Sequence, residues 1–276
     1  MSLQLERGVV GYWCPMLATT GLRLYDRSGR GNRGTLTNMD AATDWVASKV
    51  RNTSGRVLDF DGSNDHVADC GNTSSFAFMI NPYVFTIEIW FKLNSLSVRQ
   101  ALAGSTTATS DRGFFLLHEI GAGGGTNSIR LVVTHGTTGQ SKDLRSPNSV
   151  VVAGWNHAVI IGRTTAANSA MVVNGRQVTT IASLDSALSA GAATRAMSIG
   201  AARISSGISL PTAGQIASFA IWNRPLTISE GQSLYRIGPG WFGKRDSRVF
   251  GYSEQFAAGF KAYWARRQSQ LIGGGL

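Results

Sequence analysis

Apolar and polar residues alternate along much of the chain, in short runs that end at turn residues. In residues 83–93, every second position from Phe85 to Leu93 is apolar. The positions between them are mixed: Val84, Thr86, Glu88, Trp90 and Lys92. A period of two is typical of a β-strand, whose successive side chains point to opposite faces of its sheet. The pattern therefore predicts a half-buried strand with its wholly apolar face against a core.

Further runs of this kind predict antiparallel pairs of strands. Residues 113–120 and 128–136 flank a Gly-rich stretch, 122–127, which is typical of a hairpin loop. Residues 157–163 and 169–178 predict a second pair of strands. Additional strands are expected at 57–60, 197–203 and 215–224.

Two local motifs predict a hairpin turn and the start of a helix. Asn174-Gly175 favours a two-residue turn, because both central positions of a type I′ turn need a positive φ. Thr227, with Glu230 three residues later, predicts a capping box and a helix that runs to about Arg236. No long amphipathic stretch interrupts the strands. The predicted fold class is therefore all-β, an antiparallel two-sheet sandwich or jelly roll.

The composition agrees with this fold class and indicates which kinds of partner the surface attracts. Of 276 residues, 43% are hydrophobic and 15% are charged, which excludes wholesale disorder and does not suit a helix bundle. The net charge is +10, carried mostly by arginine. A basic surface attracts nucleic acid, acidic proteins or anionic glycans, and the sum alone does not choose among them.

The two cysteines and the chain start bear on the cellular compartment. Cys14 and Cys70 allow one disulfide at most, and we expect two free thiols. The first residues lack a basic segment followed by an apolar one, so we expect no signal peptide. No apolar run approaches 18 residues, so we expect no membrane span.

The composition shifts after Ile237, where Gly238-Pro239-Gly240 interrupts the chain. We therefore predict a sandwich at 1–237 and a basic, aromatic C-terminal tail at 238–276. The interleaved aromatic and basic residues favour docking on a protein over binding to nucleic acid, because such side chains dominate protein interfaces. The expected anchor residues are Trp241, Arg245, Arg248, Phe260, Trp264, Arg266 and Arg267.

Seven segments, in a consistent order, resemble the laminin-G-like, concanavalin-A-like jelly-roll family over about residues 8–237. The segments include GVVGYW at 8–13, LYDRSGRGNRGTL at 24–36, LDFDGSNDHV at 58–67, FTIEIWFK at 85–92, GWNHAVI at 154–160, MVVNGRQV at 171–178 and GQIASFAIWNRPLTISE at 214–230. The resemblance implies a two-sheet jelly roll, glycan recognition as a common role, and a structural Ca²⁺ in many members. No other cofactor is implied.

The resemblance assigns structural roles to most motif residues. Trp90, Trp155 and Trp222 are expected in the core, and His157 as a strand side chain with a hydrogen-bonded nitrogen. The residues that could hold Ca²⁺ are Asp26, Asn32, Asp61 and Asp65. The alternative is that these short polar side chains only close turns.

Enzyme chemistry finds little support in the sequence. Glucanases of this fold carry closely spaced carboxylates on one strand, whereas the best strand here holds Glu88 alone. We therefore predict no catalytic residues and keep a glycoside hydrolase as a remote alternative. Loops 104–113 and 136–149 could form a glycan-binding face, although they hold no aromatic residue. Plain loops are the competing interpretation.

The ending YWARRQSQLIGGGL, residues 263–276, resembles the ends of laminin-G-like proteins of bacteriophages. Our prediction is a non-enzymatic phage structural protein, of capsid-decoration or fibre type, assembled in the host cytoplasm and carried in the virion. The tail would attach it to capsid or tail proteins, and we expect a homo-oligomer. The alternative is an adhesin that binds cell-surface glycans.

Overall fold

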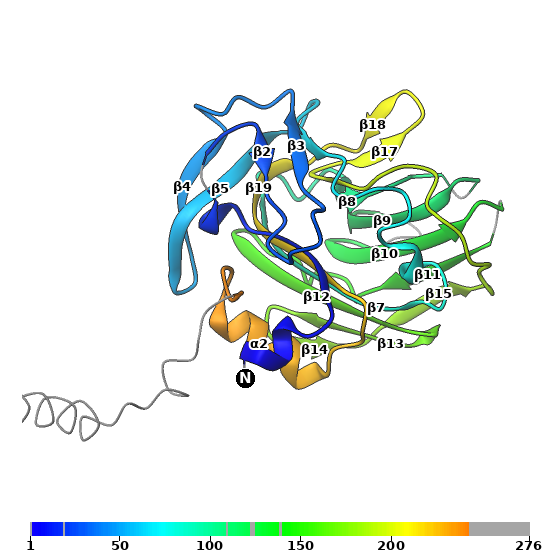
Figure 1. Ribbon diagram of the computed structural model, residues 1–276. Coiled ribbons are helices and arrows are strands. Elements are labelled where there is room, and N and C mark those ends of the chain that lie inside the picture. Colours follow the sequence, from blue (N-terminus) through cyan, green and yellow to red (C-terminus); the bar gives the residue numbers. More distant parts are fainter. Residues whose placement is uncertain (1, 19, 109, 122–124, 138–139, 243–276) are drawn as a thin grey trace, which may run out of the picture.

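The computed structural model of the chain describes residues 2–18, 20–108, 110–121, 125–137 and 140–242 (Figure 1). Two antiparallel sheets, sheet A and sheet B, pack face to face. This confirms the predicted fold class. Sheet A has the order β14-β13-β12-β7-β19-β5-β4, and β1 also pairs with β19. Sheet B has the order β15-β11-β10-β9-β8-β16-β6-β3-β2.

The strands of the two large sheets and of one small hairpin have the following bounds. Sheet A contains β1 (Val9–Trp13), β4 (Trp45–Val50), β5 (Thr53–Asp61), β7 (Val84–Leu93), β12 (Trp155–Arg163), β13 (Thr165–Val173), β14 (Arg176–Val178) and β19 (Ala213–Trp222). Sheet B contains β2 (Arg23–Leu24), β3 (Gly34–Thr37), β6 (His66–Ala68), β8 (Gln100–Gly104), β9 (Arg112–Glu119), β10 (Ser128–His135), β11 (Ser141–Arg145), β15 (Ile181–Asp185) and β16 (Ser198–Ile199). The hairpin is formed by β17 (Ala202–Ile204) and β18 (Gly207–Ser209).

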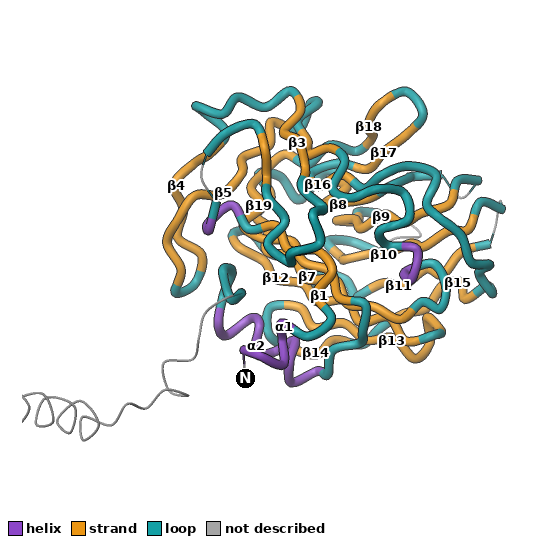
Figure 2. The backbone as a smooth tube through the Cα atoms, in the orientation of Figure 1, coloured by secondary structure: helices purple, strands orange, loops and turns teal. Residues whose placement is uncertain are grey.

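Helical segments are short and lie outside the sheets (Figure 2). They are α1 (Ser2–Glu6), α2 (Ile228–Ile237) and two 3-10 turns, η1 (Pro15–Leu17) and η2 (Ala77–Met79). In the described residues, neither α-helix is long and apolar enough to span a membrane. The predicted capping box is confirmed, because Glu230 N donates to Thr227 Oγ1 and Thr227 N donates to Glu230 Oε2.

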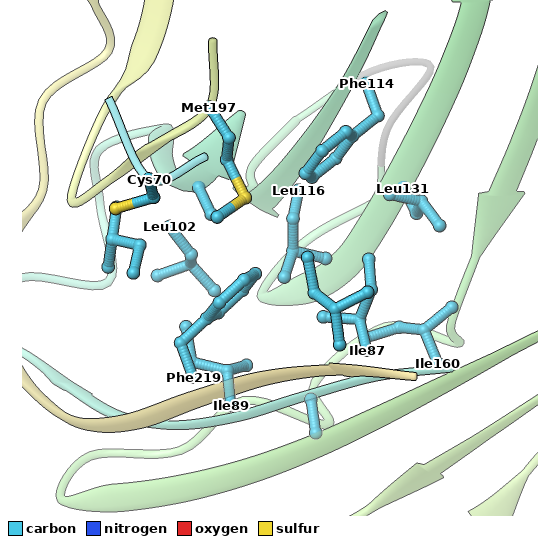
Figure 3. Close-up of a cluster of buried hydrophobic side chains, with 14 of the residues drawn as sticks. Cys70, Ile87, Ile89, Leu102, Phe114, Leu116, Leu131, Ile160, Met197 and Phe219 are labelled. Carbon is cyan, nitrogen blue, oxygen red and sulfur yellow. The ribbon is translucent and has the colours of Figure 1, made fainter. Parts of the chain in front are cut away.

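The core lies between the two sheets (Figure 3). Sheet A contributes Ile87, Ile89, Ile160 and Phe219, which point toward side chains of sheet B. The labelled partners from sheet B are Leu102, Phe114, Leu116 and Leu131. The apolar set of residues 85–93 therefore lies where its period-two pattern predicts.

The outer face of β7 departs from the prediction of a half-buried strand. Thr86, Glu88 and Trp90 are buried as fully as the core-facing set. The cause is a second apolar layer, in which Leu234 of α2 and Trp241 pack with Trp222 on the outer face of sheet A. Side chains distant in sequence therefore cover a face that a local pattern leaves open.

Several local predictions can be checked directly. Both predicted strand pairs form antiparallel ladders, β9 with β10 and β12 with β13. Asn174 and Gly175 have φ of 50° and 78°, as a type I′ turn requires, and they join β13 to β14. Gly175 is also needed for space, because a Cβ atom there would lie 2.3 Å from Tyr235 Cδ1.

The tryptophan and cysteine predictions have mixed outcomes. Trp90 and Trp222 are buried as expected, whereas Trp155 is half-buried at the margin of the Trp90 cluster. Cys14 and Cys70 are both free, as predicted, and both are buried. Burial raises the pKa of the Cys14 thiol to about 11, so this thiol is neutral at physiological pH.

A candidate binding site at one end of the sandwich

A cavity of about 330 Å³ opens at the end of the sandwich where β7 begins and β12 ends. It lies between the segment from Ile80 to Tyr83, the turn at Thr164 and Thr165, β11, and the chain that leaves β15. We call it the rim cavity. Figure 1 shows β11 and β15 on the side of the molecule away from α2. Loops at the end of a sandwich commonly carry function, because the sheets hold them in place.

The charged residues of the rim cavity form one ion pair. Lys142 of β11 and Asp185 of β15 are paired residues in the ladder, and Lys142 Nζ donates to Asp185 Oδ1. Lys142 is 6% exposed, and its Nζ lies 5.1 Å from the ring centroid of Tyr83. An ammonium group at this distance is attracted by the ring. The lysine is therefore held in place from two sides.

Asp185 also connects the cavity to sheet A. Its Oδ1 accepts a hydrogen bond of 2.9 Å from Ala166 N at the start of β13. Partial burial raises the pKa of Asp185, but the hydrogen bonds from Ala166 and Lys142 outweigh burial and lower this pKa below its usual value. The carboxylate is therefore ionised at neutral pH, with 28% of its side chain exposed.

The wall around Tyr83 combines backbone strain with an incompletely satisfied hydroxyl. Tyr83 and Thr164 have positive φ of 63° and 54°, and Thr164 N donates to Tyr83 O at 3.0 Å. Such conformations are costly for residues other than Gly and often occur at functional sites. Tyr83 is 1% exposed, and its Oη has no partner of hydrogen-bond geometry among the described residues, although Ser169 lies near.

The rest of this end of the molecule is a polar network. Arg112 Nε donates to His135 O at 3.0 Å, and Arg112 Nη2 donates to Ser189 Oγ at 3.3 Å. Arg112 belongs to the predicted loop 104–113, and these contacts join it to the end of β10 and to the segment after β15. Ser189 directly follows Leu188, which lines the rim cavity. The prediction of a plain loop at 136–149 was wrong in part, because residues 141–145 form β11, whose Lys142 lines the rim cavity.

Glu88 lies in a different environment, deep under the outer layer of sheet A. Its side chain is fully buried and accepts a hydrogen bond from Ser218 Oγ at 3.2 Å. A glycosidase needs two carboxylates that reach the sugar. The remote hydrolase alternative depended on Glu88, and the structure places this carboxylate out of reach of a substrate.

His157 does not have the satisfied nitrogen that we expected. Its Nε2 lies 3.4 Å from Glu88 Oε1, but neither ring nitrogen makes a hydrogen bond of good geometry within the described residues. The ring instead packs between neighbours, 4.7 Å from the Trp90 ring and 5.8 Å from that of Tyr235. Aromatic packing is therefore the main interaction of this side chain.

The first pair of predicted calcium ligands is already engaged. Asp26 Oδ1 accepts from Tyr12 N and Ser28 N at 2.9 and 2.8 Å. Asp26 Oδ2 accepts from Ser28 Oγ and Asn32 N at 2.8 and 3.0 Å. A cation at this carboxylate would have to displace these donors. Asn32 Nδ2 donates to Val10 O at 2.7 Å, which fixes the loop against β1.

The second pair of predicted ligands also closes a turn. Ser63 N donates to Asp61 Oδ1 at 2.7 Å, and Asp61 N donates to Asp65 Oδ2 at 3.1 Å. Across the described residues, no three His, Cys, Asp or Glu side chains gather closely enough to hold a metal ion, so Asp26 does not join this pair. The geometry favours the plain-turn interpretation, and calcium binding stays a prediction.

Among the seven predicted anchor residues, Trp241 can be placed. It is 1% exposed, and its ring stacks on Trp222 at 5.3 Å and contacts Tyr12 at 4.8 Å. The folded module therefore continues past the predicted boundary at 237, and Trp241 contributes to the core of the module itself. The other six, Arg245, Arg248, Phe260, Trp264, Arg266 and Arg267, lie outside the described residues.

Comparison with known families assigns the class of this fold. A family model described as the concanavalin A-like lectin/glucanases superfamily matches residues 61–230, more than half of the chain. The chain therefore belongs to this superfamily, and the predicted resemblance is confirmed at that level. The likeness to bacteriophage proteins stays a prediction. No curated protein sequence matches the chain.

Two solved structures with a TM-score above 0.5 support the same fold at low sequence identity. A botulinum neurotoxin type C structure, described by its dependence on two ganglioside molecules for cell entry, is 11% identical with a TM-score of 0.57, and the match covers 86% of this chain and 53% of the toxin chain. The binding domain of botulinum neurotoxin DC in complex with rat synaptotagmin II is 10% identical with a TM-score of 0.54, with 84% and 52% coverage. The CBM40 of Ruminococcus gnavus IT-sialidase is 15% identical with a TM-score of 0.45, with 70% and 97% coverage.

Proposed function

We propose that this protein is a non-enzymatic binding module that takes a carbohydrate in the rim cavity. The observation that carries the proposal is the cavity, whose volume of about 330 Å³ falls within the range of small-ligand sites. Its lining combines apolar surface, from Ile80, Pro82 and Leu188, with a few polar groups that converge on one space. A sugar ring has the same two kinds of surface, hydroxyl groups around its edge and C–H groups on its faces.

The class of protein supports the proposal at the level of the fold. Lectins belong to the superfamily of this chain. One structural neighbour with a TM-score above 0.5 is described by its interaction with gangliosides, which are glycolipids. Fold alone does not assign a site. The proposal therefore depends on the residues of the rim cavity, which a substitution experiment can test.

The experiment compares two substitutions in the same segment. Ala187 lines the rim cavity, whereas Ala190 does not, and both are exposed. We expect binding of the full chain to a glycan array, loss of that binding in Ala187→Trp, and full retention in Ala190→Trp. An array without binding, or equal binding by the two variants, would refute the proposal.

The predicted attachment to a virion is a separate proposal about residues 243–276, which lie outside the described residues. Figure 1 supports it in one respect, because the last described residues lie beside α2, on the side away from β11 and β15. Attachment through the tail would leave the rim cavity exposed to a ligand. Deletion of 243–276 should abolish incorporation into phage particles. Undiminished incorporation would refute the prediction that this tail anchors the protein. Light scattering of the full chain tests the predicted homo-oligomer.

A further inference from the structure

We infer that the rim cavity selects an uncharged sugar, through a pair of neighbouring hydroxyl groups that bridge Lys142 and Asp185. This inference rests on the proposed function, because it names the class of sugar that the same cavity takes. Its starting observation is the charge of the lining. Lys142 and Asp185 are the charged residues among those that line the cavity, and they are bonded to each other.

The balance of charge argues against an acidic sugar. A carboxylate or sulfate group is recognised best by cations that are free to donate, such as an unpaired arginine. Here the lysine already donates to a carboxylate, and that carboxylate would repel a second anion at close range. The lowered pKa of Asp185 keeps this negative charge in place at neutral pH. Repulsion from Asp185 would therefore oppose the attraction of an acidic glycan to Lys142.

A neutral diol matches the same pair without such a conflict. An ammonium group has three protons to donate, and a carboxylate has several acceptor positions on two oxygens. A hydroxyl group both donates and accepts, so one hydroxyl can accept from Lys142 Nζ while its neighbour donates to Asp185. Hydrogen bonds to charged partners are the stronger class. The ion pair is therefore suited to two adjacent hydroxyl groups.

The remaining lining residues supply secondary contacts of the same neutral kind. Thr164, Thr165 and Asn81, whose side chains carry hydroxyl and amide groups, line the cavity. Asn81 Nδ2 donates to Leu188 O at 2.5 Å, which ties two walls of the cavity together. All of these groups are uncharged, so they add hydrogen bonds without favouring an anion or a cation.

The test uses the full chain on an array that carries neutral, sialylated and sulfated glycans, followed by titration calorimetry with the strongest neutral glycan and its sialylated counterpart. We expect the neutral glycans to bind and the acidic ones to bind more weakly. The affinity for the neutral glycan should change little between low and high salt, because no net charge is neutralised. Asp185→Asn should weaken it by about tenfold, since one charge-assisted hydrogen bond is replaced by a neutral one.

The control for charge is Asp69→Asn, because Asp69 is exposed and lies outside the lining. If the Asp185→Asn variant does not fold, the Lys142→Gln variant and the salt series test the same contact between the ion pair and the glycan. Preference for sialylated or sulfated glycans that Ala187→Trp abolishes would overturn this inference and leave the proposed function standing. Binding that Ala187→Trp does not affect would overturn both.

Discussion

Two pairs of ionisable side chains, one in each half of the molecule, differ in their access to solvent. Glu88 and His157 lie fully buried on the outer face of sheet A, where the His157 ring packs against Trp90 and Tyr235. Lys142 and Asp185 lie at the end of sheet B, where a cavity meets them. The sequence analysis considered Glu88 because glucanases of this fold carry their catalytic carboxylates on a strand. Access to a ligand, and not the residue type, separates the structural pair from the candidate site.

The largest expected effect concerns the layer that closes the Glu88 pair from solvent. Trp241→Ala should lower the free energy of unfolding by about 3–5 kcal/mol, because it removes a buried ring from contact with Trp222 and Tyr12. Urea denaturation followed by circular dichroism measures the change. Tyr25→Ala is the control, because this ring is 51% exposed, and its cost should stay within about 0.5 kcal/mol. Equal costs would show that residues 238–242 do not stabilise the module.

A smaller effect is expected at Glu88 itself. Glu88→Gln keeps the shape of the side chain but changes its interaction with Ser218 and His157, so we expect a loss of about 1–3 kcal/mol in unfolding free energy. Glycan binding should be unchanged, in contrast to Asp185→Asn. Release of reducing sugar by the unaltered chain, abolished in Glu88→Gln, would instead make Glu88 catalytic.

The smallest effect is a dependence of stability on pH. Burial lowers the pKa of His118, whereas in the unfolded chain a histidine titrates near ~6.5. The unfolded state therefore binds more protons below that pH, and stability falls as the pH decreases through about 6.5. His118→Gln should flatten this slope in urea titrations at pH 5.5 and 7.5. An unchanged slope would exclude His118 as its source.

The same pH series sharpens the comparison of the two regions. The pKa of Asp185 is lowered, so its carboxylate stays ionised throughout the range in which His118 acts. Glycan binding by the folded fraction should therefore stay constant from pH 7.5 to 5.5 while stability declines. A parallel loss of both properties would mean that the rim cavity depends on a histidine.

Local patterns predicted those parts of the fold that depend on neighbours in sequence. The core face of residues 85–93, the Asn174-Gly175 turn and the Thr227 capping box follow from periodicity, backbone conformation and one hydrogen-bonded turn. The family resemblance predicted burial of Trp90, but local patterns could not predict burial of Glu88. The outer face is covered by Tyr235 and by residues beyond the expected domain boundary, which reach it through tertiary packing.

The sequence around Lys142 and Asp185 gave even less indication of the candidate site. Lys142 and Asp185 are 43 positions apart, and the register between β11 and β15 brings them together. One sign was present in the sequence, because Lys142 occupies the same strand face as Leu144, a core residue. A charged residue on an apolar face requires a partner, but the sequence does not say which residue provides it.

The contact between Tyr12 and Gly240 has a practical consequence for work with this protein. Gly240 N donates to Tyr12 Oη at 2.9 Å, so the first strand and the last described residues lie side by side. Figure 1 shows the last described residues beside α2, on the side away from β11 and β15. A fluorescent reporter or a surface tether attached after Gly240 would therefore lie on the side of α2 and leave the rim cavity unobstructed.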